Sequence, residues 1–276
     1  MLVSSIGQLW RSQHLFSKAV FNAVLGLSLF AGVAVNASAT SCEQLNSASI
    51  SSTNISPQHL SATYSVTTSQ GEQKRFTLLR NAEQVIYQHN DVSFELWNKQ
   101  GEYVRYFPKQ QRSISYRKGD LLSLNMQFDY QQLSQLIAPK TLQQLTLVSA
   151  QQATQQTASA IDLTCLQAKH YRNEQHQHQQ LQLTWLPELA LPATMTMVQD
   201  GQQLKFQLVA LTPLSSAEFA EHTANYRDMD FADVGDNESD PFIAQMIHQG
   251  FIQHGSSGFY DSQGNALSTG AAGHQH

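Results

Sequence analysis

The stretch that decides the fold reads SFELWNKQGEYVRYFPKQQRSISYR and spans residues 93–117. It contains three short runs of aromatic and β-branched residues, over 93–98, 103–107 and 113–117, and such residues favour strands. Gln100-Gly101 forms a turn signal between the first two runs. A spacing of about ten residues per strand leaves no room for crossover helices, so the stretch predicts an antiparallel meander.

The same pattern continues on both sides of this stretch. Turn residues separate the further runs, and Asp200-Gly201 between two of them is a strong hairpin signal. The further strands are expected over residues 63–68, 73–80, 84–88, 161–166, 181–185, 193–198 and 204–211. Together with the opening stretch they predict a mainly β fold, a curved antiparallel sheet or half-barrel of about 10–11 strands with one or two covering helices.

One helical segment interrupts the strands. Apolar residues recur there at spacings of three and four, which is typical of a helix with one apolar face. They are Met126, Tyr130, Leu133, Leu136 and Ile137. Pro139 is expected to end this helix, and the glutamine-rich residues 151–159 are expected to form a linker.

Three segments in the second half of the chain carry a resemblance to a known family. They are Trp185-Leu186-Pro187, Leu191-Pro192-Ala193-Thr194-Met195 and Asp200-Gly201-Gln202-Gln203-Leu204. With the meander and the central helix, the chain resembles the periplasmic LolA/LolB/RseB-like half-barrels over about residues 60–212. The resemblance implies a half-barrel domain over residues 40–212, closed by helices around an apolar cavity that binds acyl chains or protein partners. It offers no counterpart for the acidic extension over residues 213–276.

Composition and charge limit the alternatives. Of the 276 residues, 41% are hydrophobic, which is enough to build a sizeable core. Charged residues make up only 13%, about half the usual share, and 36 glutamines provide much of the polar surface instead. The net charge of −5 and the isoelectric point near 6.1 exclude a nucleic-acid binder with a broad basic face.

Residues 1–39 are expected to be a signal peptide. Arg11 and Lys18 precede an uncharged stretch over residues 19–35, and Ala37-Ser38-Ala39 offers small residues for cleavage near Ala39. A membrane anchor and a lipid-modified Cys42 are the alternatives. Cleavage predicts a protein of the bacterial envelope, periplasmic or secreted, with at most transient membrane contact.

The chain has two cysteines, Cys42 and Cys165, and both follow the expected cleavage site. In an oxidising compartment an even pair is most simply a disulfide, so these two residues are expected to be joined.

The C-terminal segment is strongly acidic. Residues 221–276 hold eight acidic residues and only Arg227 as a basic one, and six of the acids lie within 228–240. Its side-chain oxygens are of the kind that calcium binds, although their spacing is not that of an EF-hand. The candidate ligands for a divalent cation are Asp233, Asp236, Asn237 and Glu238. A solvated linker with helix-capping acids, or a contact to a basic partner, would explain the same residues.

A short helix is expected over residues 241–250. Asp240-Pro241 is a typical helix start and Gly250 a typical stop. Phe242, Met246 and Ile247 lie on its apolar stripe, and an isolated helix of this length is marginal in water. We therefore expect an interaction helix that docks on its own sheet, with residues 228–240 as a solvated strap, or on a partner.

Chemistry-bearing residues give weaker signals. Trp97, Tyr103, Tyr106 and Phe107 are candidates to line a ligand cavity, although aromatic strands often form ordinary core. His176 and His178 alternate as metal ligands on a strand would, and surface histidines would look the same. The sequence lacks the nucleophile elbow, the zinc-protease motif, the phosphate loop and the dinucleotide fingerprint.

These observations predict an exported, non-enzymatic envelope protein without a cofactor. It would bind an apolar ligand such as a lipid or acyl chain, or another envelope protein, in the concavity of a β half-barrel. The alternative is a cation-dependent structural or protein-interaction module that works through the acidic C-terminal segment.

Overall fold

The structure is a computed structural model. It describes residues 55–126, 128–152, 163, 166–173, 179–199, 201–252, 259–260 and 266–267. The expected signal peptide, both cysteines, and His176 and His178 lie outside the described residues. No helix among the described residues is long and apolar enough to cross a bilayer.

Twelve strands of the described part form one sheet, in the order β12-β6-β5-β4-β3-β2-β1-β11-β10-β9-β8-β7. Their bounds are β1 (Leu60–Thr68), β2 (Gln73–Arg80), β3 (Gln84–Gln88), β4 (Phe94–Asn98), β5 (Tyr103–Phe107), β6 (Arg112–Tyr116), β7 (Thr146–Gln152), β8 (Gln167–Arg172), β9 (Gln179–Leu186), β10 (Leu191–Gln199), β11 (Gln202–Pro213) and β12 (Arg227–Asp230). A separate small pair joins β13 (Phe259–Tyr260) and β14 (Ala266–Leu267).

Short helices connect and cover these strands. The α-helices of the described residues are α3 (Lys118–Ser123), α4 (Tyr130–Gln135), α5 (Pro139–Gln144), α6 (Ser216–Glu221) and α7 (Pro241–His248). Three single turns of 3-10 helix accompany them, η1 (Pro108–Gln110), η2 (Phe231–Asp233) and η3 (Gly235–Asn237).

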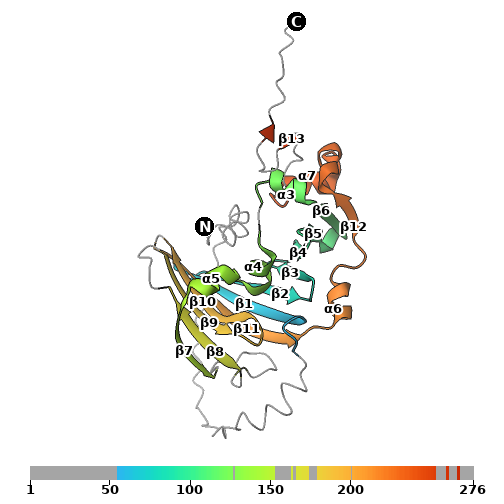
Figure 1. The fold of residues 1–276 in the computed structure, drawn as a ribbon. Helices are drawn as coiled ribbons and strands as arrows, with labels where there is room; N and C mark the ends of the chain where they lie inside the picture. The colour runs from blue at the N-terminus through green and yellow to red at the C-terminus, as the bar shows by residue number, and fades with distance from the viewer. Residues whose placement is uncertain are drawn as a thin grey trace, which may run out of the picture.

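The expected mainly β fold is confirmed. All strand pairs of the large sheet are antiparallel except β12 with β6, and the sheet is strongly curved without closing on itself (Figure 1). The hairpin signal at Asp200-Gly201 joins β10 to β11, where Gly201 has the positive φ of 76° that glycine adopts freely. The sheet is centred on β1, which pairs with both β2 and β11.

Strand alternation gives the sheet two different faces. The inner face carries one apolar cluster that runs from β9 to β6 and includes Phe76, Trp97, Tyr103, Phe107, Ile114, Leu183, Trp185, Met195, Phe206 and Leu208. Helices α3, α4 and α7 add Leu121, Leu133, Ile243 and Met246 to this cluster, and Leu142 of α5 packs against it, so these helices cover the inner face. The outer face carries a smaller cluster around Leu79, Ile86 and Leu96, against which Phe219 of α6 packs.

Several elements differ from the sequence predictions. The helix expected to end at Pro139 instead ends at Leu136, whose φ is 62°. Pro139 starts the next helix, because proline is well suited to a first helical position. Residues 146–152 form strand β7, although their last two residues had been assigned to a linker. The strand expected over 161–166 lies mostly outside the described residues; Leu163 is in no strand, and β8 begins at Gln167.

The acidic segment is more ordered than a solvated strap. Residues 227–230 form β12 along the edge of the sheet, and η2 and η3 follow before α7 begins. The hydroxyls of Ser113 and Ser115 on β6 donate to the Asp228 carboxylate at 2.7 and 2.8 Å. These bonds explain why so polar a segment adds a strand to the sheet.

Candidate functional site

The inner face is the candidate site, and its first notable feature is a buried arginine. Arg80 lies at the end of β2 and is only 5% exposed. Its guanidinium donates to the carbonyl oxygen of Ser134 in α4 at 2.5 Å and to that of Leu189, in the turn before β10, at 2.6 Å. The hydroxyl of Tyr87 on β3 donates to the preceding carbonyl of α4, that of Leu133. The sheet thus binds the C-terminal end of α4 through side chains.

The position of this arginine is electrostatically favourable. The carbonyl end of a helix carries partial negative charge and has no hydrogen-bond partners within the helix. Arg80 supplies both a positive charge and donors there. Burial nevertheless lowers the pKa of Arg80, and it raises the pKa of Tyr87 above its usual value. The contact therefore compensates a real desolvation cost.

A second buried arginine lies farther along the inner face. Arg105 on β5 donates to the Glu95 carboxylate at 2.5 Å and to the Tyr103 hydroxyl at 2.7 Å. It also donates to the carbonyl oxygen of Phe251, just beyond α7. Although burial by itself lowers the pKa of Arg105, the neighbouring Tyr103 and Glu95 groups raise it overall, so the guanidinium stays charged.

Helix α7 covers this second part of the face. The ring of Phe242 packs edge-on against the ring of Phe107, with centroids 5.1 Å apart. The Met246 residue is only 1% exposed. Asp240 caps the helix start through the backbone N–H of Phe242 and pairs with Arg112 at 3.3 Å. At the other end, the N–H groups of Gly250 and Phe251 donate to the carbonyls of Ile247 and Met246, which is a Schellman motif.

In this arrangement the expected interaction helix packs on its own chain. Of the three residues expected to dock, Met246 is buried, while Phe242 and Ile247 are partly buried against the inner cluster. The helix start at Asp240-Pro241 and the stop at Gly250 are also confirmed, and Gly250 has the positive φ of 75° that such a stop requires.

The four aromatic candidates do not lie together. Trp97, Tyr103 and Phe107 are on the inner face, where the Trp97 and Tyr103 rings stack with centroids 4.1 Å apart. Tyr106 alternates to the outer face and stacks on Phe94. The inner three belong to a closely packed layer under the covering segments.

The acidic candidates do not form a metal site. Among the described residues, no group of three His, Cys, Asp or Glu side chains is placed to hold a metal ion. Asp233, Asp236, Asn237 and Glu238 lie on the turns η2 and η3 and just after them, where the Asn237 amide donates to the backbone carbonyl of Asp233. The divalent-cation site expected from the sequence is therefore not assembled by these residues.

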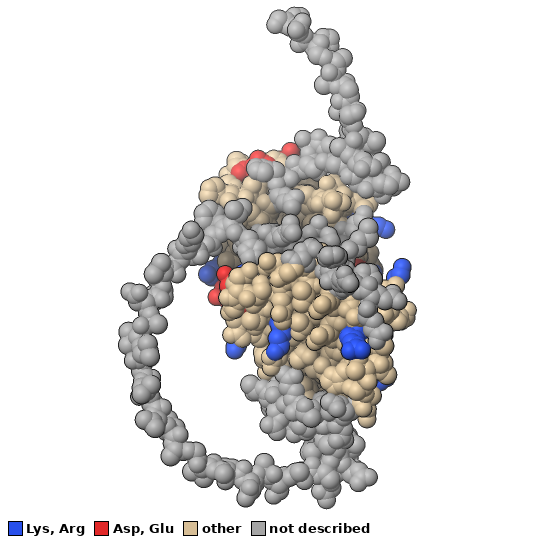
Figure 2. All heavy atoms as spheres, turned by 90° about the vertical axis from the view of Figure 1, so that its left-hand side faces the viewer, with Lys and Arg blue, Asp and Glu red and all other residues tan. Residues whose placement is uncertain are grey.

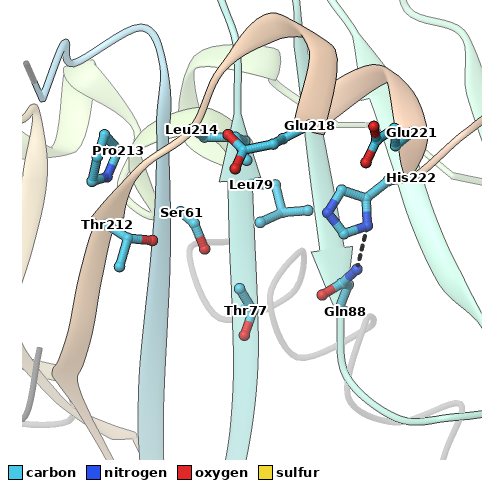
Figure 3. Close-up of a pocket in the computed structure, with 10 residues that line it drawn as sticks. All are labelled: Ser61, Thr77, Leu79, Gln88, Thr212, Pro213, Leu214, Glu218, Glu221 and His222. Carbon is cyan, nitrogen blue, oxygen red and sulfur yellow. Dashed lines mark hydrogen bonds between the residues drawn. The ribbon is translucent and has the colours of Figure 1, made fainter.

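The outer face carries a separate pocket of about 450 Å³ beneath α6 (Figure 3). Ser61, Thr77 and Thr212 line it from the strands, and Glu221 and His222 line it from the end of α6. The His222 ring is hydrogen-bonded to the Gln88 amide at 3.2 Å, which ties the end of α6 to β3. Glu218 also faces the pocket, but its carboxylate caps α6 by accepting from the Ser215 N–H at 2.8 Å.

Sequence reasoning missed the charged residues of the inner face. Arg80, Glu95 and Arg105 each fall at a position where strand alternation requires an inward side chain. That conflict between pattern and residue type was a usable signal, since charged side chains are almost never buried without a partner. Charged residues are sparse on the surface. Figure 2 shows one side of the molecule on which most described residues are neither acidic nor basic.

No family model and no curated protein matches the sequence. Solved structures to which it is similar include PNGF-II, at 8% identity and a TM-score of 0.39, covering 70% of this chain and 33% of that one. The MucA/MucB complex of Pseudomonas aeruginosa is similar at 16% identity and a TM-score of 0.31, covering 64% of this chain and 59% of the other.

A putative outer membrane lipoprotein-sorting protein domain from Vibrio parahaemolyticus is similar at 10% identity and a TM-score of 0.28, covering 66% of this chain and 96% of that one. The chain thus spans about a third of PNGF-II and about six-tenths of the MucA/MucB match. Solved structures to which the chain is similar thus include MucB and a putative lipoprotein-sorting protein domain.

Proposed function

We propose that the protein binds an apolar chain, such as the acyl chain of a lipid, between the inner face of its sheet and the cover formed by α4 and α5. It acts in the bacterial envelope and binds without catalysing a reaction. The observation that carries the proposal is the contact of Arg80 with the backbone of α4. Arg80 holds α4 only through hydrogen bonds to backbone carbonyls, and such bonds can break and form again. The helix is therefore attached reversibly over an apolar surface.

The cover itself is weak. Helices α4 and α5 have six residues each, and helices of this length are not stable in water on their own. Their attachment depends on Leu133, Leu136 and Ile137 and on the bonds from Arg80 and Tyr87. When the cover lifts, it exposes one continuous apolar layer.

The layer under the cover suits a flexible apolar ligand. It contains Met195 and Met197 on β10, and methionine side chains adapt easily to different shapes. The polar groups of this part of the face are engaged with backbone carbonyls, which supports binding rather than catalysis. A ligand bound beneath the cover also explains why an exported protein with little surface charge would keep so large an apolar layer on one side of its sheet.

The acidic segment supports the alternative function less well. Three of its carboxylates are used by the chain itself, because Asp228 binds β6, Asp230 pairs with Arg117 at 2.5 Å and Asp240 caps α7. The candidate cation ligands Asp233, Asp236 and Glu238 are different residues, and among the described residues they are not grouped so as to hold a metal ion.

Extraction tests the proposed function directly. The protein is purified from the bacterial envelope without detergent, extracted with organic solvent and analysed by mass spectrometry. We expect a stoichiometric amount of an acyl-chain lipid. Recovery of no lipid, together with failure of the folded protein to bind the apolar dye N-phenylnaphthylamine, would contradict the proposal.

A variant tests the role of the cover. Arg80→Met removes the bonds to α4, so we expect dye binding to become faster. Arg75→Met, an exposed arginine on the same strand, is the matched control and should bind dye at the wild-type rate.

A further inference from the structure

We propose that the ligand carries a neutral head group that both donates and accepts hydrogen bonds, an amide or an alcohol, and that Glu95 and Trp97 bind it. This inference rests on the proposed function and specifies the class of lipid. Both side chains lie on β4, two residues apart and therefore on the same inner face.

The two side chains are buried with unsatisfied polar atoms. Glu95 is 6% exposed and Trp97 is 2% exposed. Within the described part of the chain, neither the Oε2 atom of Glu95 nor the Nε1 atom of Trp97 has a hydrogen-bond partner. Leaving a buried polar atom unpaired costs about 1–3 kcal/mol, so two such atoms on one face are an exception that calls for a partner.

The chemistry of these atoms defines what they can bind. A carboxylate oxygen beside an arginine only accepts hydrogen bonds, and an indole N–H only donates. A head group with one donor and one acceptor satisfies both atoms, as an amide or a hydroxyl does.

The surrounding charges favour a neutral group. Glu95 and Arg105 form an ion pair at 2.5 Å with no net charge, and Arg105 donates further hydrogen bonds to the Tyr103 hydroxyl and the Phe251 carbonyl. An anionic head group would meet the Glu95 carboxylate. A cationic one would approach Arg105 and leave the Trp97 N–H unsatisfied, and burying a third, unpaired charge is costly.

The cover of the proposed function also controls access to this pair. The ring of Phe128 packs on Trp97 with centroids 3.9 Å apart and an angle of 63° between the ring planes. Phe128 lies directly before Asp129, which caps α4, so it moves when α4 lifts. The head group then takes the place of the Phe128 ring while the apolar chain lies along the inner layer.

A head-group series tests the inference. Dodecanamide, dodecanol, dodecanoate and dodecylamine share one chain and are compared by displacement of N-phenylnaphthylamine. We expect the amide and the alcohol to bind more tightly than both ions. Trp97→Phe keeps the ring but removes the N–H, and it should weaken the neutral ligands about five- to tenfold without affecting the ions.

Tyr106→Phe is the matched control, because it also removes one polar hydrogen from an aromatic side chain but lies on the outer face, on the neighbouring strand β5. It should change none of the four affinities. A measurement on the unaltered protein guards against misfolding of the variant: the indole N–H resonance of Trp97 should shift downfield with the amide and not with dodecanoate.

The outcomes separate the two proposals. Equal affinities for all four ligands, or tightest binding of an ion, with no effect of Trp97→Phe, would overturn the head-group inference and leave the proposed function standing. If none of the ligands and no dye binds to the folded protein, the proposed function itself fails.

Discussion

Arg80 and Arg105 perform the same task at two places on the inner face. Each extends from a strand and donates to a backbone carbonyl at or just beyond the C-terminal end of a covering helix. A lysine could not replace them equally well, because the planar guanidinium presents several donors in a fixed geometry and binds more than one acceptor at once. Each arginine therefore contributes to holding one covering segment on the sheet.

Breaking the inner ion pair should be costly. Replacing Glu95 with Leu leaves the Arg105 charge buried without its partner, so we expect the free energy of unfolding to fall by about 3–5 kcal/mol in a urea titration. The double variant Glu95→Leu with Arg105→Met should lose less than Glu95→Leu alone. The exposed pair Lys99–Glu83 is the control, and its loss should cost less than about 1 kcal/mol.

His89 should make stability depend on pH. Its ring lies beside Tyr87 and Phe76, and burial lowers the pKa of His89, with Glu95 acting in the opposite direction and Arg105 in the same one. A histidine with a lowered pKa binds its proton more tightly in the unfolded chain. Its contribution is therefore present above the unfolded pKa of about 6.5 and is lost as the pH falls through the lower folded value.

We expect the melting temperature to decrease as the pH falls from about 6.5 towards the lowered folded pKa of His89, and His89→Gln to make this decrease smaller. His248→Gln, at an exposed site on α7, should leave the pH profile of the wild type unchanged. If the His89 and His248 variants had the same dependence of melting temperature on pH, the role assigned to His89 would be wrong.

At the scale of elements, the strands with clear alternation were predicted well. β2, β3 and β5 have the expected bounds, and the others of the first meander lie within a few residues, because each carries apolar residues on a half-buried surface. β12 could not be predicted, since its sequence Arg-Asp-Met-Asp favours a loop, and its place in the sheet depends on pairing with β6 and on contacts such as those of the β6 serines with Asp228.

The same distinction applies to the site. The apolar stripe and both ends of α7 follow from sequence rules, whereas the partners of Arg80 are carbonyls of α4 and of the turn before β10. No local pattern shows which distant backbone group a charged side chain will meet. The apolar residues of the inner cluster could thus be predicted in outline. The hydrogen bonds between its charged side chains and distant backbone carbonyls could not.

Helix α7 should contribute to the stability of the isolated protein. Replacing the buried Met246 with Ala removes side-chain contacts with the inner face and should lower the free energy of unfolding by about 2–5 kcal/mol. Gln245→Ala, on the exposed side of the same helix, should change it by less than about 0.5 kcal/mol. Unchanged stability of the Met246 variant would mean that α7 serves a partner instead.

At the scale of the whole molecule, the inner face has two covers with separate fastenings. Arg80 holds α4, and Arg105 with Arg112 holds the segment around α7. Since the two covers share no fastening residue, we expect them to open independently. Native-state hydrogen exchange should show faster exchange over residues 130–144 in Arg80→Met, with residues 241–252 unchanged. Equal acceleration in both segments would indicate one cooperative cover.

The pairing of β1 with β11 has a consequence for how the chain folds. The neighbouring strands from β1 to β6, and those from β7 to β11, are pairs that lie close in sequence and can form early as two separate meanders. Their joint aligns Leu60 with Pro213, the most distant pairing of the large sheet's two halves, and such nonlocal contacts form slowly. Because a chain is synthesised from its N-terminus, one edge of β1 therefore stays unpaired until β11, the last long strand, has been made.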